Sequence, residues 1–208
     1  MYNCYRNPYM NTVSYLRVLH ASPDAPGVDV YLNNMIVASN LKFKDFTPYL
    51  PLMPGLYNVK VFPANTQVNP VINANIEVKP NSDYTVAAAG MLKEIKPIII
   101  DDTSGRIPVN KGQVKFVHLS PDAPAVDITL PDGTILFENI KFGETSEKLL
   151  LDPGTYTLQA RVSGTDNVVL TVPNVKINPQ KYYTVYAVGL VDGPPPLQVL
   201  IALDKASY

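Results

Sequence analysis

Residue types that can support chemistry recur in two short motifs of the chain. The stretch HASPDAPGVDV occupies residues 20–30, and HLSPDAPAVDI occupies residues 118–128. A serine near a histidine and a carboxylate has the composition of a nucleophilic triad, whereas a histidine with two carboxylates can ligate a metal ion. The candidate residues are His20, Ser22, Asp24 and Asp29 in the first motif, and His118, Ser120, Asp122 and Asp127 in the second.

The serines are poorly placed for nucleophilic catalysis. Ser22 and Ser120 each precede a proline, whose nitrogen has no hydrogen to donate to an oxyanion. The chain also has no GxSxG nucleophile elbow. We therefore expect no enzymatic activity and no catalytic residues, and a hydrolase is the least favoured function.

The ligand count argues against a metal ion. A structural zinc takes four ligands, and a catalytic zinc takes three with at least one further His or Cys, but each motif has one histidine. The single cysteine, Cys4, forms neither an intrachain disulfide nor a thiol cluster. Calcium ligation by Asp24, Asp29 and loop carbonyls stays open, although the acidic residues do not alternate as in an EF-hand. We expect no metal and no cofactor.

A structural role fits the strand pattern around the motif. His20 shares its parity with Leu16 and Val18, so its ring ends a row of core-facing side chains, while Arg17 has the opposite parity. Both nitrogens of a buried ring need partners, and the nearest groups belong to the following SPDAP turn. Asp24 follows a proline and suits an Asx-turn. We interpret the motif as a staple at a corner between two strands, repeated around His118.

The similarity between the motifs extends over two halves of the chain. LRVLHASPDAPGVDVYL matches VKFVHLSPDAPAVDITL at an offset of 98 residues, and MPGLYNVKV and DYTVAAAG match DPGTYTLQA and YYTVYAVG further on. This period exceeds the roughly 20 to 50 residues of a solenoid repeat and is long enough for an independent core. We predict a polar tail over residues 1–14, one domain over 15–103, a linker over 104–112 and a second domain over 113–208.

Alternating side chains predict β-strands with one buried face. In VDVYL, Val28, Val30 and Leu32 share one face, opposite Asp29 and Tyr31. YTVAAAG and YTVYAVG are apolar on both parities, which is typical of a central strand covered on each side. About seven or eight such runs in each half, separated by turn signals and without an amphipathic helix, indicate a β-sandwich. We predict an all-β protein of two tandem β-sandwich domains, either immunoglobulin-like or transthyretin-like in topology.

These stretches resemble the DUF4397 domain family, a bacterial family of unknown function. VLHASPDAPGVDVYLNN, LKF, LPLMPGLYNVKVF and DYTVAAAG carry the resemblance, and the second half matches at the same points from Val114 to Gly189. The resemblance covers nearly the whole chain apart from the tail and implies two tandem copies. The family is associated with extracellular and envelope proteins, which implies a module of a cell surface.

The charge and hydropathy of the chain argue against nucleic acid and a transmembrane helix. With 17 basic and 18 acidic residues, a net charge of -1 and no basic run, the chain is not expected to bind nucleic acid. No stretch reaches the roughly 18 apolar residues of a transmembrane helix. The N-terminal residues lack the features of a secretory signal, which favours synthesis without that route and leaves the compartment open. Sequence does not determine the oligomeric state.

We therefore expect a non-enzymatic structural or interaction module of a bacterial cell or spore surface, with protein or carbohydrate as its partner. A domain that binds carbohydrate or another small ligand is the alternative. Tyr57 and Tyr156 can stack on sugars, although packing is the more common role of such residues. An adhesive role of the N-terminal tyrosines is a further alternative to a tail without function, and these tyrosines are Tyr2, Tyr5, Tyr9 and Tyr15.

Overall fold

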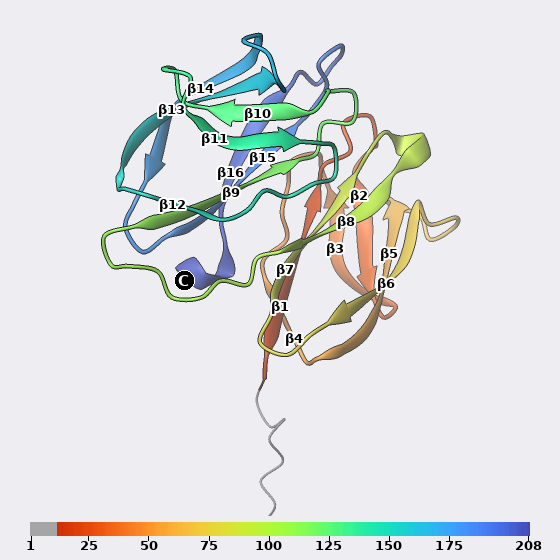
Figure 1. Ribbon diagram of the computed structural model, residues 1–208. Helices are drawn as coiled ribbons and strands as arrows, with labels where there is room; N and C mark the ends of the chain where they lie inside the picture. Colours follow the sequence, from red (N-terminus) through yellow and green to blue (C-terminus); the bar gives the residue numbers. More distant parts are fainter. Residues whose placement is uncertain (1–11) are drawn as a thin grey trace, which may run out of the picture.

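The computed structural model describes residues 12–208, and residues 1–11 lie outside this description. Over the described range the chain forms sixteen β-strands and two short 3-10 turns, Leu92–Glu94 and Lys205–Ser207. The strands build four four-stranded sheets, which make two sandwiches that lie side by side (Figure 1). No helix within residues 12–208 has the length and hydropathy that a membrane crossing needs. The predicted all-β fold with two tandem sandwiches is confirmed.

The first sandwich consists of strands β1 to β8. Its two sheets have the strand orders β4-β1-β7-β8 and β3-β2-β5-β6. The connection from β8 to the next strand covers residues 102–111 and contains no strand. The strand bounds are β1 Ser14–His20, β2 Val28–Leu32, β3 Met35–Leu41, β4 Leu50–Leu52, β5 Gly55–Pro63, β6 Ile72–Val78, β7 Asp83–Ala89 and β8 Lys96–Asp101.

The second sandwich repeats this topology with strands β9 to β16. Its sheets have the orders β12-β9-β15-β16 and β11-β10-β13-β14. In each half the first strand pairs in parallel with the seventh, through Leu16 and Tyr84 or through Val114 and Tyr183. The strand bounds are β9 Gly112–His118, β10 Val126–Thr129, β11 Ile135–Ile140, β12 Leu149–Leu151, β13 Gly154–Val162, β14 Val168–Ile177, β15 Tyr182–Val188 and β16 Gln198–Leu203.

Each sandwich has its own apolar core. In β1 the alternating residues Leu16 and Val18 face the first core, as the strand parity predicted. Tyr57 and Tyr156 pack against the two cores, and their hydroxyls donate to the carbonyl oxygens of Met53 and Asp152 at 2.9 and 2.8 Å. These tyrosines therefore stabilise the turns that precede β5 and β13.

A third apolar cluster lies between the sandwiches. The sheet with β1 and β7 faces the sheet with β9 and β15 (Figure 1), which explains why YTVAAAG and YTVYAVG are apolar on both parities. Ala87 and Tyr186 hold equivalent positions, and both are completely buried, so a small residue of one sheet leaves room for a large one of the other. The cluster comprises Leu19, Ala21, Ala87, Ala89, Ile98, Ile100, Val117, Leu119, Tyr186 and Val188.

Candidate functional site

Each motif forms the corner that leads out of the first strand of its sandwich, and the histidine is its buried centre. The Nε2 of His20 donates to the carbonyl oxygen of Pro26 at 2.9 Å, and Nδ1 accepts the N–H of Ser22 at 3.3 Å. The same two bonds surround His118, at 3.1 and 3.3 Å. Burial lowers the pKa of both imidazoles, so the rings are neutral at pH 7 and carry their proton on Nε2.

Asp24 and Asp122 tie this corner to the loop after the seventh strand. Asp24 accepts the N–H of Leu92 at 2.7 Å. Asp122 accepts the N–H groups of Val191 and Asp192 at 2.9 and 3.0 Å; burial of its carboxyl opposes ionisation, but these donors outweigh it and lower the pKa. The Asx-turn prediction was wrong, because these bonds reach a distant loop that local sequence spacing does not reveal.

The serine hydroxyls point to the same carboxylates and not to the histidines. Ser120 Oγ donates to the carbonyl oxygen of Gly189 at 2.7 Å and lies 3.2 Å from Asp122, while Ser22 Oγ lies 3.5 Å from Asp24. Both serines are completely buried. Since backbone groups use both nitrogens of each histidine, the imidazole is not directed at the hydroxyl as a base would be.

Asp29 and Asp127, near the C-terminal end of each motif, each accept two backbone N–H groups. Asp29 accepts the N–H of Asn40 at 2.7 Å with one oxygen and the N–H of Asn65 at 2.9 Å with the other. It thereby joins an irregular stretch of β3 to the loop after β5. Asp127 repeats this arrangement at 2.6 and 2.9 Å; burial opposes ionisation of its carboxyl, but the two N–H donors outweigh it and lower the pKa.

The eight motif residues therefore serve several backbone junctions and do not converge on one point. Their polar atoms bond mainly to backbone groups of neighbouring strands and loops. Within residues 12–208 no three His, Cys, Asp or Glu side chains gather in the way that a metal ion requires. Cys4 lies outside the described residues.

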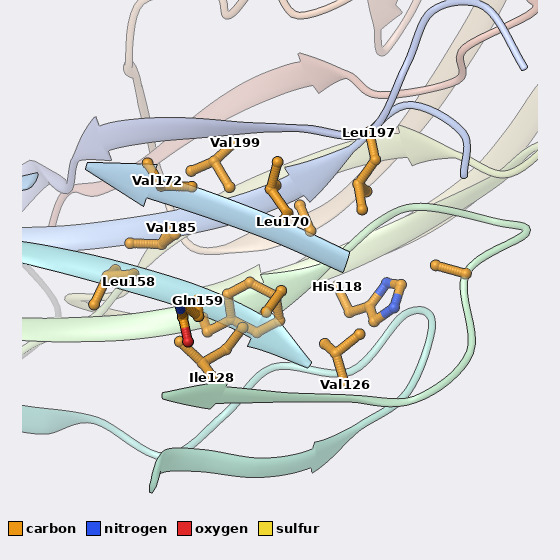
Figure 2. A pocket seen from close by; sticks show the side chains of 14 residues that line it. His118, Val126, Ile128, Leu158, Gln159, Leu170, Val172, Val185, Leu197 and Val199 are labelled. Carbon is orange, nitrogen blue, oxygen red and sulfur yellow. The ribbon is translucent and has the colours of Figure 1, made fainter. Parts of the chain in front are cut away.

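The second sandwich contains a small apolar cavity next to this corner. The His118 ring lies at one end of it beside Val126, and Leu158, Val185 and other core side chains line the rest (Figure 2). Its volume of about 20 Å³ is room for about one water molecule. The cavity is a packing gap in the core and is too small for an organic ligand.

Four buried charges that the sequence analysis did not identify lie between the sandwiches. Arg17 and Lys115 are 5% and 1% exposed, and Asp102 and Asp204 are 0% and 1% exposed. Arg17 Nη2 lies 3.3 Å from Asp204, and Lys115 Nζ lies 2.7 Å from Asp102. Each pair joins a cation on the first strand of one sandwich to a carboxylate that follows the last strand of the other. We call these four residues the charge cluster.

Hydroxyl groups complete the charge cluster. Tyr49 donates to Asp102 at 2.7 Å, and Thr184 donates to Asp204 at 2.7 Å. Burial and repulsion from Asp102 raise the pKa of Asp204 to about 6, although the nearby cations oppose the shift. Burial also raises the pKa of Tyr49, so this hydroxyl keeps its proton and can donate.

An open groove runs along the junction beside Arg17. The groove has a volume of about 530 Å³, and both sandwiches contribute to its walls. Tyr15, Phe46 and Tyr49 come from the first sandwich, while Lys205 and Tyr208 follow β16 of the second.

The repeated strand order and the repeated corner bonds accompany a family match. The profile of the family described as "Domain of unknown function (DUF4397)" matches residues 14–129, which is more than half of the chain. The chain belongs to the DUF4397 family. The match spans the first sandwich, the connection to the second and the strands β9 and β10.

Comparisons beyond the DUF4397 family give weaker results. No curated protein matches the chain. The C-terminal domain of AlgF from P. aeruginosa is 16% identical over 45% of this chain and 98% of its own length, with a TM-score of 0.36. The Bacillus anthracis TIE protein is 15% identical over 86% of this chain and 34% of its own, with a TM-score of 0.28. A family CBM26 module of Eubacterium rectale Amy13K, solved with maltoheptaose, is 8% identical over 93% and 99%, with a TM-score of 0.30. TM-scores this low support no argument about function.

Two features of this DUF4397 chain point to the charge cluster in hindsight. Arg17 and Lys115 occupy the same register in the two halves, each beside a strand that is apolar on both parities. If both faces of the sheet are covered, the side chain of a charged residue on the neighbouring strand must lie in one of the two covered layers. The carboxylates gave no comparable signal, because Asp102 and Asp204 lie just beyond the strands.

Proposed function

We propose that this DUF4397 protein is a non-enzymatic interaction module of a bacterial cell or spore surface, in which two tandem DUF4397 copies form one rigid body. The observation that carries this proposal is the interface between the sandwiches. Crossed ion pairs and an apolar cluster bury side chains from both halves. Two sandwiches joined in this way present the loops of both copies on one scaffold.

The interface favours a single body over two independent domains. Separation would expose the apolar residues of the third cluster, such as Leu19, Ile100 and Val117, to water. It would also remove Arg17 from Asp204 and Lys115 from Asp102, and breaking a buried ion pair is strongly unfavourable. We therefore expect the two copies to meet a partner as one unit.

The interpretation as tandem copies rests on repeated structure as well as repeated sequence. Both halves have the same strand order, the same parallel pairing of first and seventh strands, and the same bonds at His20 and His118. The non-enzymatic role is supported by the motif geometry, since the serines are buried and the imidazoles are engaged with the backbone.

Immunogold labelling of the protein in its native host tests the surface role. We expect label on the outside of cells or spores, whereas label confined to the cell interior would contradict the proposal. A probe for reactive serines tests the non-enzymatic role separately. The wild type and a Ser22→Ala/Ser120→Ala variant should react equally little with a fluorophosphonate, and labelling that the variant loses would indicate a nucleophile.

A further inference from the structure

The groove beside Arg17 has the dimensions and composition of a ligand site. Its volume of about 530 Å³ lies within the roughly 300 to 1,000 Å³ that is typical of small-molecule sites. Residues of β1 and of the loop from Phe46 to Tyr49 form one wall, and residues from the end of β16 to Tyr208 form the other. The site therefore exists only when the two sandwiches are joined.

Aromatic rings dominate the walls. Tyr15, Phe46, Tyr49 and Tyr208 line the groove, and Tyr208 is 81% exposed. A tyrosine offers a flat apolar ring face and a hydroxyl at its edge. A sugar ring has the matching pattern, with C–H groups on its face and hydroxyls around its rim.

The two charged side chains that line the groove are both cations. The lining includes Arg17 and Lys205 but no aspartate or glutamate. Arg17 lies within 4.8 Å of the Phe46 ring centroid and is already paired with Asp204. Lys205 Nζ lies 4.3 Å from the centroid of the Tyr15 ring and makes no ion pair within residues 12–208. One ammonium group is thus available to an anionic ligand.

The equivalent place on the other side of the interface has a different composition. The strand registers of the two sandwiches show which positions are equivalent. Gln113, Thr145 and Lys148 of the second sandwich correspond to Tyr15, Phe46 and Tyr49 of the first. None of these three counterparts is aromatic.

The connection between the sandwiches also covers that side. Gln113 Nε2 donates to Ser104 Oγ at 2.8 Å, Tyr182 donates to the Gly105 carbonyl at 2.8 Å, and Lys148 Nζ donates to the Thr103 carbonyl. Aromatic residues at the positions of Tyr15, Phe46 and Tyr49 are therefore found on the open side and are not a general requirement for packing two sandwiches.

We infer that the groove binds a carboxylate-bearing oligosaccharide, of which one sugar ring stacks on the exposed Tyr208 while a carboxylate pairs with Lys205. This inference rests on the proposed interaction function and assigns its ligand class.

Isothermal titration of the full chain tests the inference. The probes are trigalacturonate and trimannuronate as acidic ligands, maltotriose as a neutral ligand of the same length, and acetate as a carboxylate without a sugar ring. We expect at least one acidic trisaccharide to bind at least tenfold more tightly than maltotriose or acetate. Binding of neither acidic probe, or equal binding of maltotriose or acetate, would overturn the inference.

Matched variants locate the binding. Lys205→Gln and Tyr208→Ala should each weaken binding of the acidic trisaccharide at least fivefold and leave the thermal midpoint unchanged, since both side chains lie at the surface of the groove. Lys148→Gln removes one charge from the opposite side and should not change the affinity. An equal loss in Lys148→Gln, or binding that appears only after deletion of residues 1–11, would overturn the assignment.

The outcomes also separate this inference from the proposed function. Label inside the cell together with binding of an acidic trisaccharide would reject the surface role and retain the groove. Label at the surface without such binding would retain the surface role and reject the ligand.

Discussion

The two sides of the interface between the sandwiches have equivalent ion pairs, but only one side is covered by the connection between the sandwiches. On both sides a cation of a first strand, Arg17 or Lys115, reaches a carboxylate of the opposite sandwich. Beside Lys115 the connection between the sandwiches lies over the junction, and beside Arg17 the junction opens into an aromatic groove. The repeated strand order therefore accounts for the framework of this DUF4397 protein, and the differences between the two sandwiches account for its candidate binding site.

Removing each cation should show how far the two sides differ. We expect Lys115→Ala to lower the free energy of unfolding by about 3 to 5 kcal/mol, because Asp102 stays buried without its closest charge partner. Arg17→Ala should cost less, because Arg17 lines the open groove, where water can take its place, and Lys115 stays 3.5 Å from Asp204. Urea denaturation of both variants measures the difference. Equal losses would mean that the open groove does not change the environment of the charge cluster.

Removing each histidine should show where the two halves agree. His20→Ala and His118→Ala should each lower the free energy of unfolding by about 2 to 4 kcal/mol, because a buried ring is lost and a backbone carbonyl loses its donor. The two losses should be similar, as the bonds are the same in both corners. Thermal denaturation provides the measurement, and unchanged midpoints in both variants would reject the staple interpretation.

The second aspartate of each corner should show a smaller difference. Asp122→Ala removes acceptors of two backbone N–H groups, whereas Asp24→Ala removes the acceptor of one. We expect losses of about 1 to 2 kcal/mol for Asp122→Ala and about 1 kcal/mol for Asp24→Ala. The comparison by urea denaturation requires unchanged m-values, and a larger loss in Asp24→Ala would contradict the count of hydrogen bonds.

The pH dependence of stability should depend on Asp204. Its pKa of about 6 in the folded chain exceeds the value of about 3.9 in an unfolded chain, so the folded state binds more protons between these pH values. The contribution of Asp204 to stability should therefore rise, on the order of 1 kcal/mol, as pH falls from about 6 to about 4. Unfolding free energies of the wild type relative to Asp204→Asn should show this rise. A relative stability that falls over this range would contradict the raised pKa.

Local sequence was sufficient for the strands and for part of the motif. Alternation in stretches such as VDVYL identifies strands because successive side chains point to opposite faces. The parity of His20 placed its ring in the buried row, and the nearby turn supplied its partners, since both belong to one short segment. The hydrogen-bond partner of Asp24 could not be predicted from local sequence, because Leu92 is 68 residues away in the chain.

The sequence by itself determined two repeated halves, an all-β architecture and buried histidine corners, because each of these depends on periodicity or on contacts within a few residues. Only the tertiary structure decided what covers the outer faces of the central strands. Strand parity separates the two faces but does not distinguish solvent from a second sheet, so the same position can hold an exposed or a buried charge. The sheets that meet at the interface buried Arg17 and Lys115 together and left the groove open on one side.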